Sequence, residues 1–359
     1  MDVANLVMDE HVPLAPLTTI GVGGAARYLA RVRGRAGVRA AVTWAADAGV
    51  PLMALGRGSN MLIGDDGFPG LVLRVGIPGA RVVETGGAVE VTVGAGVSWA
   101  ALVRYAVARD WAGIECLAGI PGLVGAGPVQ NIGAYGQEVC ETILRVEALD
   151  LHTRQTVTFN NAECRFGYRT SRFRRDEPGR YLILSVTYRL IPGGAPYINY
   201  VELERTLAAW AIKDPTIQDV YRAVWEIRRG KSMVLREGDP NTRSAGSFFT
   251  NVQLTAAQMQ ALDEAIAREL PGARIPRFRQ PEGNYKAPAA WLIERAGFAR
   301  GHCAGPVGLS TNHALAIINR GGATARDVLA LARAIRDAVH DRFGVSLVPE
   351  PMLIGCAWE

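Results

Sequence analysis

The sequence of 359 residues predicts an α+β protein built from more than one lobe. In the first half, short apolar segments alternate between strand and helix periodicity, strands return between residues 142 and 190, and amphipathic helices dominate after residue 196. A hydrophobic content of 49% and a charged content of 20% allow a sizeable core, which excludes a disordered or fibrous chain.

The first half contains the signals of two α+β lobes. Strands are expected at residues 25–32, 51–55, 89–96, 143–151 and 181–190. Helices are expected at residues 39–49, which end at a glycine, and at residues 98–110, where Ser98 is a plausible N-cap.

A boundary follows these lobes, because residues 191–196 hold two prolines and two glycines. Beyond it, helices are expected at residues 201–210, 217–229, 255–270, 287–297 and 325–343, with a strand at 313–319 and an apolar closing strand at 345–355. The expected division is into two α+β lobes at 1–70 and 71–193 and a helix-covered substrate domain at 194–359.

Composition excludes several classes of function. The five cysteines are dispersed and odd in number, which predicts neither a disulfide framework nor a metal site and fits a reducing cytoplasm. We expect no export signal and no membrane anchor. The net charge of +5 is spread along the chain, so nucleic-acid binding is not expected, whereas an anionic small substrate is compatible with it.

Only three of the 39 basic residues are lysines, namely Lys213, Lys231 and Lys286. In a chain where arginine is the default cation, a lysine can mark a site that needs a compact ammonium group. Chance is the alternative, and it is the better interpretation for Lys213, which lies in a polar stretch.

A first glycine-rich loop places Gly56, Gly58, Ser59 and Asn60 directly after the buried strand at 51–55. Glycines there let backbone N–H groups converge on a pyrophosphate. A structural turn remains the alternative, and the loop does not match the Rossmann pattern.

A second loop, residues 118–136, runs without a charged residue. Long loops of this kind are usually functional when their apolar content argues against disorder. Such a loop suits the flat, uncharged isoalloxazine ring of a flavin, with Gln130 and Asn131 for its polar edge. Taken alone, this loop too could be a structural turn, but the two loops together favour a ligand.

A set of motifs resembles one enzyme family, the UDP-N-acetylenolpyruvoylglucosamine reductases, also called UDP-N-acetylmuramate dehydrogenases. The motifs are TTIGVGGAARY, LGRGSNMLI, LAGIPGLVGAGPVQNIGAYG, FGYRTSRF, RSAGSFFTN and the closing VPEP. They run in order from about Thr18 to Glu350, and PYINYVELERTL resembles the longer type with a tyrosine-bearing substrate loop. Leu123, Gly127 and Val252 depart from the usual pattern, which leaves the fine fit of the flavin loop open.

The resemblance implies that the lobes at 1–70 and 71–193 form an FAD-binding unit of the vanillyl-alcohol oxidase type. It also implies that the C-terminal α/β domain at 194–359 binds the UDP-sugar and that its closing strand at 345–355 returns to the active site. FAD is expected to be noncovalent, because neither loop contains histidine or cysteine. The implied FAD contacts are Gly56, Arg57, Gly58, Ser59, Asn60, Met61, Ile120, Pro121, Gly122, Gly125, Ala126, Pro128, Gln130, Asn131, Gly133 and Ala134. A cytoplasmic monomer is expected.

The implied reaction is the NADPH-dependent reduction of UDP-N-acetylglucosamine enolpyruvate to UDP-N-acetylmuramate. Arg169 would stabilise the substrate carboxylate, because a guanidinium is always charged and matches a carboxylate. Glu350, flanked by prolines and apolar residues, either pairs with a cation or lies beside Arg169 at the site. Ser247 matches the family's proton donor, although a serine after glycine is ordinarily a turn or cap. Without the motif, Arg169 would read as a surface cation.

The family pattern also places four residues around the UDP diphosphate and sugar, namely Tyr200, Lys231, Asn251 and Lys286. For Tyr200 the alternative is a residue that covers a helix end. Two other functions remain open: a flavin oxidase of the same fold that uses oxygen, and a flavin- or nucleotide-sugar-binding protein without catalysis.

Overall fold

The computed structural model describes residues 6–280 and 283–359, and the chain forms two compact units. The first unit extends to Val12 and includes Ala26–Arg57 and Phe68–Leu235. The second unit contains Pro13–Ala25, Gly58–Gly67 and the described part of Arg236–Glu359. The chain therefore passes from one unit to the other several times, instead of completing each unit in turn.

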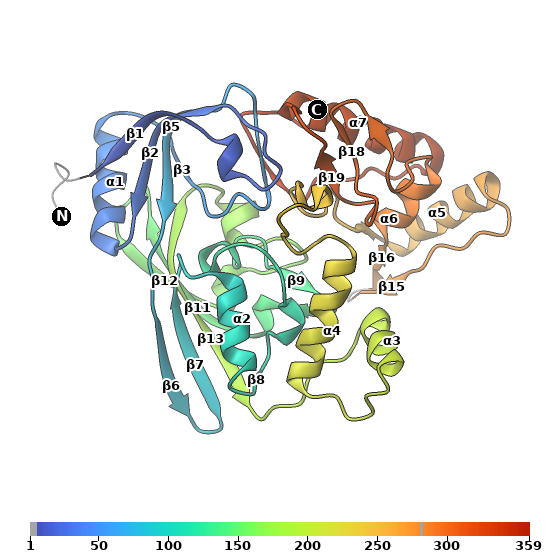
Figure 1. Cartoon of the computed structure of the whole chain (residues 1–359), viewed down its shortest axis with the longest axis horizontal. Helices are drawn as coiled ribbons and strands as arrows, with labels where there is room; N and C mark the ends of the chain where they lie inside the picture. Colours follow the sequence, from blue (N-terminus) through green and yellow to red (C-terminus); the bar gives the residue numbers. More distant parts are fainter. Residues whose placement is uncertain (1–5, 281–282) are drawn as a thin grey trace. The chain divides into compact units, whose positions relative to one another are not determined.

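The first unit begins with a four-stranded sheet in the order β1-β2-β5-β3. Its strands are β1 (Met8–Pro13), β2 (Ala25–Val32), β5 (Phe68–Val75) and β3 (Leu52–Ala54). β5 is parallel to both β2 and β3, and helix α1 (Arg35–Asp47) connects β2 to β3 as parallel strands require. One face of α1 packs its apolar residues against β2 and β5 (Figure 1).

A larger sheet of mainly antiparallel strands follows in the same unit (Figure 1). Its order is β12-β11-β13-β7-β6, and β8 pairs with the end of β13. The strands are β12 (Thr156–Asn160), β11 (Ile143–Asp150), β13 (Tyr181–Pro192), β7 (Ala88–Gly94), β6 (Ala80–Thr85) and β8 (Trp111–Ala112). Helix α2 (Trp99–Val107) covers this sheet, with the buried Trp99 ring 5.9 Å from that of Tyr188.

Two helices complete the first unit, α3 (Val201–Ala209) and α4 (Ile217–Gly230). Thr216 and Asp219 form a capping box that begins α4 and satisfies its first backbone N–H groups. Leu203 and Leu207 of α3 pack against Val220 and Val224 of α4 in a small apolar cluster.

The second unit is assembled from short strands. One sheet has the order β14 (Val252–Leu254), β16 (Tyr285–Ala287) and β15 (Phe278–Arg279), and another has β17 (Cys303–Ala304), β18 (Val307–Leu309) and β19 (Ile317–Asn319). In addition, β4 (Met61–Ile63) pairs in parallel with β20 (Met352–Ile354), although almost 300 residues separate them.

Helices α5 (Ala256–Glu269), α6 (Ala289–Arg295) and α7 (Ala325–Phe343) cover these strands. Along α7 the buried residues Val328, Ala332, Ile335 and Val339 recur every three to four positions, so one face enters the core. The same core contains Phe248 and Phe249.

The structure confirms the expected α+β content, and each helix expected in the second half is present. Both strands predicted in the second half are much shorter than expected. The strand expected at 313–319 forms only at Ile317–Asn319, because the Ala316 N–H donates to the His313 carbonyl and makes a turn. The closing segment 345–355 is a strand only at Met352–Ile354, after two prolines.

The compact units divide the chain differently from the expected domains. Helices α3 and α4, expected in the substrate domain, belong to the first unit, which ends at Leu235 instead of near residue 193. The division into two FAD lobes and a substrate domain stays a functional prediction.

Candidate functional site

Ser247 lies on a segment that is held from both sides by main-chain hydrogen bonds in the second unit. The Phe248 N–H donates to the Leu315 carbonyl at 2.7 Å, and the Phe248 carbonyl accepts from the Glu350 N–H at 2.8 Å. Phe248 and Phe249 are each 1% exposed and anchor the segment in the core, whereas Ser247 is half-buried. Backbone pairing therefore brings Ser247 and Glu350 onto adjoining segments.

The Ser247 hydroxyl contacts a side chain that the sequence did not single out. Its Oγ lies 3.4 Å from Nε2 of His313, a half-buried residue in the turn before β19. The motif for Ser247 carried no signal for this contact, because 66 residues separate the two positions.

Glu350 is also tied to the first glycine-rich loop. The Asn60 side chain donates from Nδ2 to the Glu350 carbonyl at 3.3 Å, and the Met352 N–H donates to the Asn60 carbonyl at 3.0 Å. These bonds continue into the parallel pairing of β4 and β20. Asn60, Ser247 and Glu350 therefore lie on three neighbouring segments of one unit.

Gly58 shows why this loop needs glycine. Its φ is +60°, and a Cβ there would lie 2.4 Å from the Leu17 carbonyl oxygen. The Gly58 carbonyl accepts from the Thr19 N–H at 3.1 Å, and the Thr19 hydroxyl donates to the Ser244 carbonyl at 2.6 Å. The TTIGVGG segment thus connects the loop to the start of the Ser247 segment.

Arg169 belongs to the first unit and is not a surface cation. Its side chain is 19% exposed, and its guanidinium donates from Nη2 to the Gly133 carbonyl at 2.6 Å. Nη1 lies 3.8 Å from Glu138 Oε1, and the guanidinium carbon is 5.2 Å from the centre of the Tyr168 ring. These contacts place Arg169 against the hairpin of β9 (Gly133–Ala134) and β10 (Gln137–Glu138).

The long uncharged loop ends in that hairpin, and its Asn131 side chain is fully engaged inside the unit. Asn131 is 0% exposed; its Nδ2 donates to Glu138 and to the Gly167 carbonyl, and its Oδ1 accepts from the Cys140 N–H. The Asn131 side chain therefore holds the loop together, and its contact with a flavin stays a prediction. Gln130 is half-buried and accepts a hydrogen bond from Arg174 at 3.0 Å.

Tyr200 and Lys231 flank helices α3 and α4 of the first unit, Tyr200 before α3 and Lys231 after α4. They meet at Tyr135, whose ring is 5.2 Å from that of Tyr200 and 5.8 Å from Lys231 Nζ. Lys231 also pairs with Glu202 at 2.5 Å. Burial, together with Glu202, raises the pKa of Tyr200, so its hydroxyl stays a neutral hydrogen-bonding group.

Sequence reasoning missed Tyr135, although its position in QNIGAYG, directly after the expected loop contacts, was a usable signal. Asn251 and Lys286 lie in the second unit. Asn251 precedes β14 and accepts from the Ala289 N–H at 3.1 Å, and Lys286 lies on the neighbouring strand β16, opposite Gln253.

The predicted site residues thus form groups within each unit. Arg169, Tyr200 and Lys231 belong to the first unit; Ser247, Glu350, Asn251 and Lys286 belong to the second. Of the predicted FAD contacts, Gly56, Arg57 and those between residues 120 and 134 are in the first unit, and Gly58, Ser59, Asn60 and Met61 are in the second.

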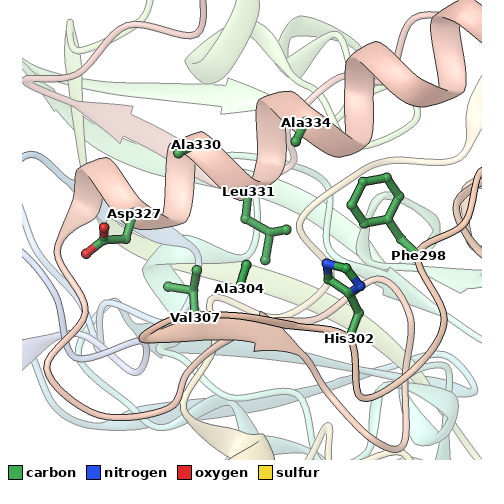
Figure 2. A pocket seen from close by; sticks show the side chains of 8 residues that line it. All are labelled: Phe298, His302, Ala304, Val307, Asp327, Ala330, Leu331 and Ala334. Atoms are coloured by element: carbon green, nitrogen blue, oxygen red, sulfur yellow. The ribbon is translucent and has the colours of Figure 1, made fainter.

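A shallow hollow of about 280 Å³ lies on the second unit between α7 and the β17–β18 hairpin. Figure 2 shows His302, Phe298 and Leu331 around it. It contains none of the predicted site residues. Across the described residues, no cluster of three or more histidine, cysteine or acidic side chains is arranged to hold a metal ion. No helix in that part of the chain is long and apolar enough to cross a membrane.

Two family models match the chain. Residues 26–158 match an FAD binding domain, and residues 239–354 match the C-terminal domain of UDP-N-acetylenolpyruvoylglucosamine reductase.

Curated relatives named UDP-N-acetylenolpyruvoylglucosamine reductase match nearly the whole chain. The relative from Streptomyces coelicolor is 45% identical over 356 residues, covering 98% of this chain and 91% of its own. The relative from Thermobifida fusca is 43% identical, with coverage of 96% and 98%. A crystal structure of the enzyme from Thermus caldophilus aligns with a TM-score of 0.64 and 25% identity, covering 98% of this chain and 99% of the other.

Proposed function

Because the chain belongs to the UDP-N-acetylenolpyruvoylglucosamine reductase family, we propose that it reduces UDP-N-acetylglucosamine enolpyruvate to UDP-N-acetylmuramate with hydride from NADPH. It is an FAD-dependent oxidoreductase of peptidoglycan precursor synthesis. When bound, FAD supplies hydride transfer between the nicotinamide and the substrate.

The residues present fit FAD. A Cβ at Gly56 would make only ordinary van der Waals contacts, with the Leu123 side chain at 3.7 Å, so nothing crowds this glycine. The backbone N–H groups of this glycine-containing loop are proposed to bind the pyrophosphate, and the same loop contains the half-buried Ser59. Half-buried Ile120 and Pro121 give the long loop an apolar, uncharged surface suited to a flat ring. Binding is proposed to be noncovalent.

The chemistry assigns separate tasks to three side chains. Adding hydride to the terminal CH2 carbon leaves an electron pair on the neighbouring carbon, delocalised into the substrate carboxylate. Arg169 would bind that carboxylate through its fixed donor array, and Glu350 would help to stabilise the same charge. Ser247 would donate its hydroxyl proton to the carbon, so the product gains one hydride and one proton.

The rest of the substrate is proposed to be held by Tyr200, Lys231, Asn251 and Lys286. The two lysines offer compact cations to diphosphate oxygens. The Lys231 ammonium lies close to the Tyr135 ring and is paired with Glu202, a carboxylate with which the diphosphate would have to compete.

One observation carries the catalytic assignment. The Glu350 N–H donates to the Phe248 carbonyl at 2.8 Å, which holds the proposed carboxyl group beside the segment of the proposed proton donor. These residues come from motifs about 100 positions apart in the sequence. If Ser247 were only a turn or cap residue, there would be no reason for a half-buried glutamate to lie on the adjoining segment.

The visible spectrum of the purified protein tests the proposal. A yellow protein should be bleached by NADPH under anaerobic conditions and should regain its colour on addition of UDP-N-acetylglucosamine enolpyruvate, with UDP-N-acetylmuramate as product. Initial rates should give parallel double-reciprocal plots, because NADPH is expected to leave before the sugar nucleotide enters. A colourless protein, or one whose colour the sugar nucleotide does not restore, would reject the assignment.

The variant Ser247→Ala isolates the proton step. It should be bleached by NADPH normally but should regain colour about 10²–10⁴-fold more slowly with the substrate, the usual contribution of a positioned acid. Ser247→Cys should retain part of the activity, because a thiol can still donate a proton. Ser346→Ala, at an exposed serine of the second unit, is the control and should behave as wild type.

Two rival functions make different predictions. A flavin oxidase would reduce oxygen rapidly after reacting with its own substrate and would not consume NADPH. A binding protein without catalysis would show no loss of turnover in Ser247→Ala.

A further inference from the structure

The contact between Ser247 and His313 is built into the backbone of the second unit. The Phe248 N–H bonds the Ser247 segment to the Leu315 carbonyl, and the Ala316 N–H closes the turn onto the His313 carbonyl at 3.1 Å. The turn is closed again by the Ser310 N–H, which donates to the Ala316 carbonyl at 2.9 Å. Both side chains are therefore presented to each other by neighbours that need no ligand to hold their places.

The geometry selects one atom of the imidazole. Ser247 Oγ lies 3.4 Å from Nε2 of His313, at the long end of the hydrogen-bond range. Catalytic hydrogen bonds are often long before substrate binds and shorten in the complex. Among the residues that the structure describes, His313 is the side chain with which the Ser247 hydroxyl forms its hydrogen bond.

A serine that acts as an acid has two requirements. Its hydroxyl hydrogen must point at the substrate carbon, and the negative charge that builds on Oγ as the proton leaves must be stabilised. A donor aimed at an Oγ lone pair meets both requirements, because it fixes the hydroxyl and cannot itself accept the proton that belongs to the substrate.

We propose that His313 is a positioning residue for Ser247: its Nε2–H donates to Oγ, directs the hydroxyl hydrogen toward the substrate carbon, and stabilises the oxygen as its proton leaves. This inference rests on the proposed function. In the step itself the Ser247 O–H bond breaks as the new C–H bond forms, and Oγ then regains a proton from water. His313 keeps its own proton throughout and does not contact the substrate.

Substitutions of His313 should have different effects according to the length of the new side chain and the presence of an N–H donor. Glutamine can place an amide N–H close to the position of the imidazole Nε2, so His313→Gln should preserve the donor. Asparagine is shorter and its amide corresponds more closely to the Nδ1 position, and leucine has no donor. His313→Asn and His313→Leu should therefore lose the contact.

The experiment measures the two half-reactions separately in the flavin-containing protein. In His313→Leu and His313→Asn, the rate at which substrate restores the yellow colour should fall about 10- to 100-fold, the scale of losing one preorganised donor. Bleaching by NADPH and the KM for substrate should stay within about 2-fold of wild type, and His313→Gln should recover most of the rate. His302→Leu, at a half-buried histidine that lines the hollow in Figure 2, is the matched control and should leave both half-reactions unchanged.

A double-mutant cycle separates positioning from a general structural role. If His313 acts through Ser247, adding His313→Leu to Ser247→Ala should cause no further loss of rate. Independent, multiplicative losses would overturn the proposal, and so would a raised KM with an unchanged rate, which would make His313 a substrate ligand.

The same measurements separate this inference from the proposed function. A wild-type protein that substrate fails to recolour would reject both. An active wild type together with fully active His313→Leu would reject only the role of His313. Should the leucine variant lose its flavin, the comparison of His313→Gln with His313→Asn decides instead, and equal rates in these two would overturn the proposal.

Discussion

Replacing Gly133 with alanine is expected to displace the Arg169 guanidinium without unfolding the protein. A Cβ at this position would lie 2.8 Å from Glu138 Cγ, 2.9 Å from Arg169 Nη1 and 3.0 Å from the Gln137 carbonyl oxygen. Unstrained contacts of a carbon atom are about 3.5–4.0 Å. The two side chains must therefore each retreat by roughly 0.5–1 Å to relieve the overlap.

The expected losses of stability and of kcat/KM in Gly133→Ala follow from the contacts of Gly133. Overpacking of this size costs about 1–3 kcal/mol of folding free energy. The Gly133 carbonyl also accepts the 2.6 Å hydrogen bond from Arg169 Nη2, so the shift acts on the group proposed to hold the substrate carboxylate. Because a misplacement of about 1 Å can cost about 100-fold in rate, we expect kcat/KM to fall about 10- to 100-fold.

Thermal unfolding and steady-state kinetics check this expectation together. The control is Gly34→Ala at the N-cap of α1, where φ is −158° and a Cβ would meet nothing within 4 Å. That control should change stability by about 1 kcal/mol or less and leave kcat/KM unaltered. If Gly133→Ala kept the wild-type kcat/KM, the close packing of the hairpin would not be what positions Arg169.

Two further predictions concern ion pairs of the first unit. Hydrogen bonds from Arg180 and from the backbone N–H groups of His152 and Thr153 lower the pKa of the nearly inaccessible Asp150 from 3.8 to about 2. These contacts therefore stabilise the fold above about pH 4 and lose this effect as the pH falls toward about 2. Arg180→Gln should lower the free energy of unfolding at pH 7 by about 1–2 kcal/mol and flatten its decline between about pH 4 and 2 in denaturant titrations. Glu202→Gln should free Lys231 for the substrate diphosphate and lower the KM for the sugar nucleotide about 2- to 5-fold with an unchanged kcat. Glu226→Gln breaks a comparable pair with Arg229 and should leave the KM unchanged.

Local sequence signals predicted the elements that depend on interactions between residues close in the sequence. The helix α7 follows from its apolar spacing and from the Thr324–Asp327 capping box, all of which lie within 20 residues. The sequence singled out Gly58 as part of a loop that could bind a pyrophosphate, and its φ of +60° adds a conformational reason for glycine at this position.

Pairings between distant segments were not predictable in this way. Nothing in residues 58–67 indicates that they join the second unit, because the parallel pairing of β4 with β20 depends on residues 352–354. The same limit applies to His313, whose partner Ser247 lies 66 residues earlier. From the sequence, α3 and α4 look like any amphipathic helices, and only their packing assigns them to the first compact unit.

Some residues of the candidate site hold the fold together, whereas others have side chains that can take part in the chemistry. Asn131 matches a family motif, and its side chain forms three hydrogen bonds that fix the hairpin. Replacing this side chain should therefore destabilise the loop, and any loss of catalysis would follow from that change. Ser247 and Glu350 are placed differently: the main chain of Phe248 bonds both neighbouring segments, and the Asn60 amide donates to the Glu350 backbone carbonyl. Their side chains can therefore be replaced while these backbone bonds remain. A loss of substrate reduction in a folded, flavin-binding Ser247 variant would then report on the proton step itself.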